Sequence, residues 1–105
     1  MNAWEVWTWG EHPCLVISNQ QRVDQKAHVV VLKGQSLYSG DPSPTRLEAV
    51  LDTADGMDRP TVFACDLLYT TRKSDLTQKR GEVRSYHRRG DISRKIVQGL
   101  ALAGL

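Results

Sequence analysis

The chain has 105 residues, of which 40% are hydrophobic and 25% charged, and its formal net charge is +2. This composition excludes a disordered chain, and the length allows one modest core, so we expect a single domain over residues 1–105. The mildly basic charge permits an anionic partner without indicating one. No apolar run approaches the ~20 residues that span a bilayer, and the N-terminus lacks a signal-peptide pattern, so we expect a cytoplasmic protein without membrane association.

Alternating and β-branched residues predict strands in the first third of the chain. Trp4, Val6 and Thr8 share one side of the first predicted strand, and three consecutive valines mark a strand buried on both faces. Turn and loop residues separate the strands, and the longest loop is predicted over residues 34–44. The predicted strands of this part cover residues 4–9, 14–18 and 28–32.

The later residues predict further short strands and then one helix. The strands are expected over residues 46–51, 61–65, 67–71, after a bend at Asp66, and 82–86. The spacing from Ile92 to Ala103 gives one apolar helical stripe, with Asp91 as N-cap and Gly104 as the stop. Five to seven short strands in so short a chain suggest a mostly β protein, a small, partly closed barrel with a C-terminal α-helix.

The cysteines and histidines do not form a metal-binding pattern. Cys14 and Cys65 each lie inside an apolar run and are predicted to be buried free thiols. The three histidines are scattered, without the spacing of a zinc site. We therefore expect no metal and no cofactor.

Four segments of the chain, in order, resemble the MazF/PemK toxin family. They correspond to the family's Gly-Glu-Val-Trp strand, its Arg-Pro-(apolar)-Val-Ser strand, its Cys-Asp to Lys-Ser-Arg-Leu segment, and its closing strand and helix. Here these segments are Glu5-Val6-Trp7, His12-Pro13-Cys14-Leu15-Val16-Ile17-Ser18, Cys65-Asp66 with Thr70-Thr71 and Lys73-Ser74-Asp75-Leu76, and Gly81-Glu82-Val83 with Ile92, Ile96 and Leu100.

The resemblance implies an SH3-like barrel, a homodimer and a metal-independent endoribonuclease that cleaves single-stranded RNA. In that activity the ribose 2′-hydroxyl attacks the adjacent phosphate and leaves a cyclic phosphate. It also implies a cognate antitoxin whose acidic or extended tail covers the RNA groove. The chain departs from the family pattern at four places. The loop between the first two strands is reduced to residues 10–12, and His12 replaces the arginine before proline. No arginine immediately precedes Asp66, and residues 33–36 stand where a Ser or Thr ends the third strand.

RNA cleavage of this kind needs a base for the 2′-hydroxyl, an acid for the leaving oxygen and positive donors around the phosphorane. Asp66 is the predicted base, since a carboxylate stands where an apolar strand should bend; a turn-forming aspartate is the alternative. His12 is the predicted acid or base near neutral pH, because the unperturbed pKa of histidine is ~6.5; an exposed turn histidine is the alternative. Asp66, His12 and Thr70 form the predicted catalytic set and should face one groove.

Further residues are predicted to bind RNA. Trp9 can stack an unpaired base, although core or dimer-interface packing is the alternative. Basic side chains can contact phosphates, with a solvated charged surface as the alternative. The predicted RNA-binding set is Trp9, Glu11, Arg72, Lys73, Arg88 and Arg89.

Two functions from different classes remain open at this stage. The first is an RNA-cleaving toxin. The second is a non-catalytic barrel of the same fold that binds RNA or a protein target such as gyrase. Incubation of the purified protein with single-stranded RNA and a chelator separates the two hypotheses.

Overall fold

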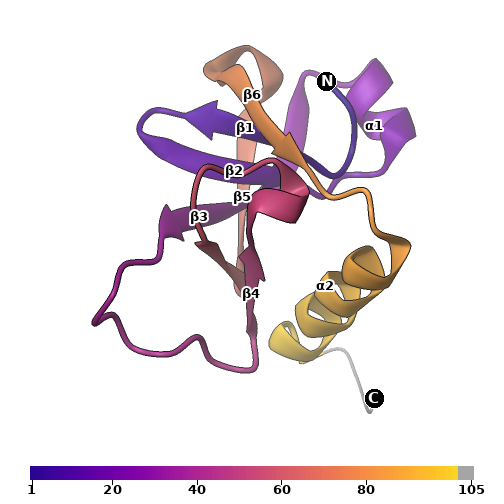
Figure 1. The fold of residues 1–105 in the computed structure, drawn as a ribbon. Coiled ribbons are helices and arrows are strands. Elements are labelled where there is room, and N and C mark those ends of the chain that lie inside the picture. The colour runs from indigo at the N-terminus through magenta and orange to yellow at the C-terminus, as the bar shows by residue number, and fades with distance from the viewer. Residues whose placement is uncertain (102–105) are drawn as a thin grey trace.

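The computed structural model describes residues 1–101, and this part contains six strands, two α-helices and two short 3-10 turns (Figure 1). No helix of the described part is long and apolar enough to cross a membrane. The strands are β1 (Glu5–Trp9), β2 (His12–Val16), β3 (His28–Ser36), β4 (Glu48–Leu51), β5 (Thr61–Arg72) and β6 (Leu76–Glu82). The helical elements are α1 (Gln20–Gln25), η1 (Thr53–Asp55), η2 (Lys73–Asp75) and α2 (Tyr86–Gly99).

All six strands form one antiparallel sheet in the order β4-β5-β3-β2-β1-β6. The sheet curls without closing, and the turn after β4 packs against β6 across the gap between the two edge strands. Gly81 of β6 is required there, because a side chain at this position would collide with the carbonyl oxygen of Asp55. The prediction of a mostly β fold with a C-terminal helix is confirmed.

Two clusters of buried side chains fill the two faces of the curled sheet, as strand alternation requires. Leu15, Leu32 and Phe63 point into the first cluster, where Ile92 of α2 joins them. The second cluster consists of Cys14, Val16, Val23, Val29, Val31 and Leu76. Cys14 and Cys65 are both buried and free, as predicted. Burial raises the pKa of each thiol to about 11.

Three predicted elements were wrong in position. The last strand ends at Glu82 rather than beginning there, and helix α2 begins at Tyr86 rather than near Asp91. The hydroxyl of Ser85 caps α2 by accepting a hydrogen bond from the Arg88 amide. The polar residues 19–26 contain the short helix α1, and β5 continues through Asp66 without a break. Ala103 and Gly104 lie outside the described residues.

Helix α2 covers the outer edge of β4 (Figure 1). The Nζ of Lys95 donates a hydrogen bond to the carbonyl oxygen of Glu48 at 2.8 Å. The guanidinium of Arg88 donates to the carbonyl oxygen of Val50, also at 2.8 Å, and lies 3.4 Å from the buried carboxylate of Asp55. Two basic side chains of the helix therefore occupy acceptors that a neighbouring strand would otherwise use.

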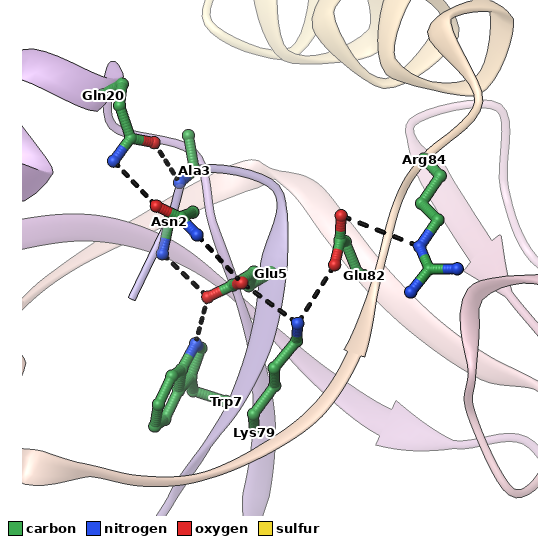
Figure 2. Close-up of polar contacts among 8 residues, drawn as sticks. All are labelled: Asn2, Ala3, Glu5, Trp7, Gln20, Lys79, Glu82 and Arg84. Carbon is green, nitrogen blue, oxygen red and sulfur yellow. Dashed lines mark hydrogen bonds and ion pairs between the residues drawn. The ribbon is translucent and has the colours of Figure 1, made fainter.

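A buried carboxylate, Glu5, joins the N-terminal residues to β6 (Figure 2). It accepts hydrogen bonds from the Asn2 amide at 2.7 Å and the Trp7 indole at 3.0 Å. It also lies 3.1 Å from the Nζ of Lys79, which bridges to Glu82. Burial by itself raises the pKa of Glu5, but these hydrogen bonds and the lysine charge outweigh it, so the pKa is lowered below 4.5.

Candidate active site

A recess of about 240 Å³ opens on the sheet where β2 begins and β3 ends. Strand β5 supplies the apolar part of its lining, and β2, β3 and β4 supply the polar part. We call the first the apolar lining (Val62, Ala64, Leu67 and Tyr69) and the second the polar lining (His12, Lys33, Gln35 and Glu48). Charged and neutral polar groups therefore meet an apolar surface in one small recess.

The recess lies at an irregularity in the pairing of β3 with β5. Leu32 pairs with Leu68, and Gly34 pairs with Phe63, so Lys33 alone stands opposite residues 64–67. Gly34 is required at this point, because a Cβ atom there would lie 2.6 Å from the Phe63 ring. The extra residues of β5 bring Ala64 and Leu67 into the lining of the recess opposite Lys33.

A larger groove of about 620 Å³ shares His12, Gln35 and Glu48 with the recess. It extends along the β3–β4 connection and includes Glu11 and Arg80. Beside His12 the groove borders a tight β1–β2 turn of only two residues, in which Gly10 has a φ of +61°. The groove can receive an extended chain, and the recess opens beside it.

Lys33 lies beside two aromatic rings. Its Nζ is 5.6 Å from the centroid of the Tyr69 ring and 6.0 Å from that of Trp9. The two rings are 5.8 Å apart and meet edge to face at 71°. These contacts orient the ammonium group within the recess that also contains His12.

Glu48 is also held in place. The amide of Thr45 donates a hydrogen bond to its Oε1 at 2.8 Å, and Lys95 anchors its backbone carbonyl. The second carboxylate oxygen, Oε2, accepts no hydrogen bond from any side chain or backbone amide of residues 1–101. One carboxylate oxygen of Glu48 is therefore oriented and still able to accept a hydrogen bond from a ligand.

Three of the residues predicted from the sequence lie at or beside the recess. His12 lines both the recess and the groove, and Glu11 lines the groove. Trp9 pairs with His12 across the β1–β2 turn and contacts Tyr69. The tight turn brings all three together.

Asp66, the predicted base, lies elsewhere. A side chain at Gly99 would come within 2.7 Å of the Asp66 Cβ, so the backbone and Cβ of Asp66 lie against helix α2, while the residue stays exposed. Its neighbours Ala64 and Leu67 line the recess instead. His12 lines both the recess and the groove, whereas Asp66 lines neither, and the role of Asp66 as the base stays a prediction.

The other predicted residues make contacts away from the recess. Thr70 pairs with Val30, and Arg72 pairs with His28 at the end of β5. The Nζ of Lys73 donates to the carbonyl oxygen of Val23 at 2.6 Å. None of these three residues lines the recess or the groove as described.

Arg88 and Arg89 make intramolecular contacts. Arg88 bonds β4, as described above, and Arg89 donates from Nε to the carbonyl oxygen of Val83 at 2.7 Å. The Arg89 guanidinium also stacks over the rings of Trp4 and Tyr86. The predicted RNA-binding arginines of this segment thus hold α2 against the sheet.

Sequence analysis missed Lys33, Glu48 and Tyr69. Lys33 follows the three valines of β3 and breaks their apolar run, which is a signal for a polar site at that strand end. Glu48 and Tyr69 carry no such signal, since only the strand order brings them beside His12. Among the described residues, no group of three or more His, Cys, Asp or Glu side chains is arranged to hold a metal ion.

Comparison with known proteins is informative at the level of structure. No family model and no curated protein matches the sequence. An endoribonuclease from a mycobacterial species superimposes with a TM-score of 0.83 at 19% identity, covering 100% of this chain and 95% of that one. The protein has the fold of the MazF toxins.

Two further solved structures agree with this assignment of fold. The Mycobacterium tuberculosis toxin MazF-mt6 gives a TM-score of 0.75 at 17% identity, covering 92% of this chain and 94% of its own. A MazE–MazF structure from Deinococcus radiodurans gives 0.75 at 15% identity, covering 98% of each chain. The predicted resemblance to MazF toxins is confirmed for the fold over nearly the whole chain.

Proposed function

We propose that this chain is a toxin endoribonuclease that cleaves single-stranded RNA in the cytoplasm by metal-independent attack of the 2′-hydroxyl. One observation carries the proposal: on a MazF fold, His12 and the oriented ammonium of Lys33 line a single recess beside an open groove. The endoribonuclease named among the similar structures supports the choice of reaction.

The side chains present can supply each chemical requirement. Glu11 accepts the proton of the 2′-hydroxyl as its oxygen attacks phosphorus. His12, in its protonated form, donates a proton to the 5′-oxygen as the P–O5′ bond breaks. Lys33 stabilises the additional negative charge of the phosphorane. The products are a 2′,3′-cyclic phosphate and a free 5′-hydroxyl.

Cleavage of single-stranded RNA in the presence of a chelator tests this proposal. His12→Gln keeps a polar side chain but removes the acid, so the cleavage rate should fall by roughly 10²-fold or more. Lys33→Gln should cause a comparable loss. Asp66→Asn is the matched control, since Asp66 lines neither the recess nor the groove, and it should cleave at the rate of the parent.

Two results would contradict the proposal. A parent protein that binds RNA without cleaving it would favour the non-catalytic barrel. If Asp66→Asn abolishes cleavage while His12→Gln retains it, Asp66 is the base and the recess is not the catalytic site.

The partners of the proposed toxin are a second copy of the chain and an antitoxin. The homodimer is supported by the exposed apolar side chains of Val97 on α2 and of Leu100, which follows the helix. The antitoxin is supported by the MazE–MazF structure of similar fold, and an extended tail suits the open groove. Sedimentation at micromolar concentration tests the dimer, and a monomer there would contradict it.

A further inference from the structure

The apolar lining of the recess is more exposed than folding requires. Leu67 is 52% exposed, although it stands beside the charged side chains of His12 and Lys33. Tyr69 follows two positions later on the same strand and presents its ring to the same recess. A flat ligand with a hydrophobic face can bind against this surface.

The Tyr69 ring is held before any ligand arrives. The edge-to-face contact with Trp9 and the nearby Nζ of Lys33 restrict its rotation. A restrained ring loses little conformational freedom when a ligand stacks on it, so more of the stacking energy appears as affinity. Stacking of an unpaired base on an aromatic side chain contributes ~1–3 kcal/mol.

The polar lining adds chemical selectivity. The ionised carboxylate of Glu48 only accepts hydrogen bonds, and the Thr45 amide donates to Oε1, so Oε2 of this lining residue can accept a hydrogen bond from a ligand. Adenine, cytosine and guanine each carry an exocyclic amino group that can donate to this oxygen. Uracil has no amino group, and its one donor on the Watson–Crick edge, N3–H, stands between two carbonyl oxygens, which a carboxylate repels.

We propose that the recess binds one unpaired base next to the scissile phosphate, stacked on Leu67 and Tyr69 and selected by Glu48 for an exocyclic amino group. This inference rests on the proposed function for the nature of the ligand, RNA, and leaves the cleavage step aside. It assigns base selection to residues that take no part in proton transfer.

Binding of short uncleavable RNA tests the inference. Fluorescently labelled 2′-O-methyl oligomers of adenine, cytosine or uracil keep the base but block the nucleophile. The parent should bind the adenine and cytosine oligomers about 10-fold more tightly than the uracil oligomer, which corresponds to ~1.4 kcal/mol. Glu48→Gln should remove this preference, because an amide both donates and accepts.

A second variant tests the stacking surface. Tyr69→Leu keeps apolar packing against Trp9 but removes the flat ring, so the affinity for all three oligomers should fall by about 10-fold. Tyr86→Leu is the matched control, since Tyr86 is 83% exposed on α2, away from the recess, and should leave affinity unchanged. Thermal unfolding of each variant verifies that it is folded.

The outcomes distinguish the two proposals. If the parent shows no base preference, or if Glu48→Gln leaves the preference intact, base selection at the recess is wrong even when the protein cleaves RNA. If the parent binds with the expected preference but cleaves no unmodified RNA, the endoribonuclease proposal fails and the base site stands. If the parent binds none of the oligomers, both proposals fail.

Discussion

Replacement of Glu5 by Gln should reveal how strongly its buried carboxylate stabilises the fold. The side chain keeps its shape in this variant but loses its charge, and with it the attraction to Lys79 and the strength of the bonds from Asn2 and Trp7. Hydrogen bonds to a charged group contribute about 1.5–3 kcal/mol, so we expect a loss of ~2 kcal/mol at pH 7. For 105 residues this lowers Tm by about 9 °C.

The pH dependence gives a second readout. Because the pKa of Glu5 is lowered in the folded state, its stabilising effect is present above the ordinary value of 4.5 and is lost as pH falls through the folded value. The difference in unfolding free energy between parent and Glu5→Gln should therefore shrink below pH 4.5. Urea unfolding between pH 3 and pH 7 measures this difference.

Glu82→Gln is the matched control for this experiment. Glu82 bonds the same lysine, but its side chain is 28% exposed, so its loss should destabilise the protein by less than about 1 kcal/mol. If Glu5→Gln destabilises no more than Glu82→Gln, or if its effect is the same at pH 3 and pH 7, the proposed stabilisation by the buried charge is wrong.

Two further predictions concern packing and thiol reactivity. Gly34→Ala places a methyl group 2.6 Å from the Phe63 ring and should destabilise the protein by ~1–3 kcal/mol in urea unfolding. The control, Gly90→Ala, lies in open space on α2 and should stabilise the protein by up to about 1 kcal/mol. Equal effects of the two substitutions would contradict the close approach of β3 to β5. Because burial raises the pKa of Cys14 and Cys65 to about 11, both thiols should resist alkylation at pH 8 until the protein unfolds. Rapid labelling of the native protein would contradict this prediction, because it would show that the thiols are accessible.

Local patterns were sufficient to predict the strands that carry buried residues. Alternation in β1 and the valine run in β3 each reflect a strand with at least one face in the core. Strand β6 lies at the edge of the sheet, and its polar residues from Thr77 to Arg80 show no such pattern. The first turn of α2 is equally polar, so periodicity placed the helix start five residues late, and the Ser85 cap went unnoticed.

The site could be predicted only where it is local in sequence. His12 and Glu11 were identified because a short turn and the motif before Pro13 draw attention to them. Lys33 and Glu48 belong to strands separated by a long loop, and they meet His12 only through the sheet order. Asp66 satisfied the chemical pattern of a base, but the pattern contains no information on the irregular β3–β5 pairing that directs its neighbours to the recess.

The contacts of Arg88 and Lys95 with β4 also affect the order in which the protein can mature. Every strand of the sheet is synthesised before α2, so a nascent chain exposes the carbonyl groups of Glu48 and Val50 until the helix has formed. During that interval the edge of β4 can pair with a strand of another chain. A chain whose translation stops before α2 therefore keeps an exposed β4 edge that can aggregate. Docking of α2 onto β4 is the step that protects this edge.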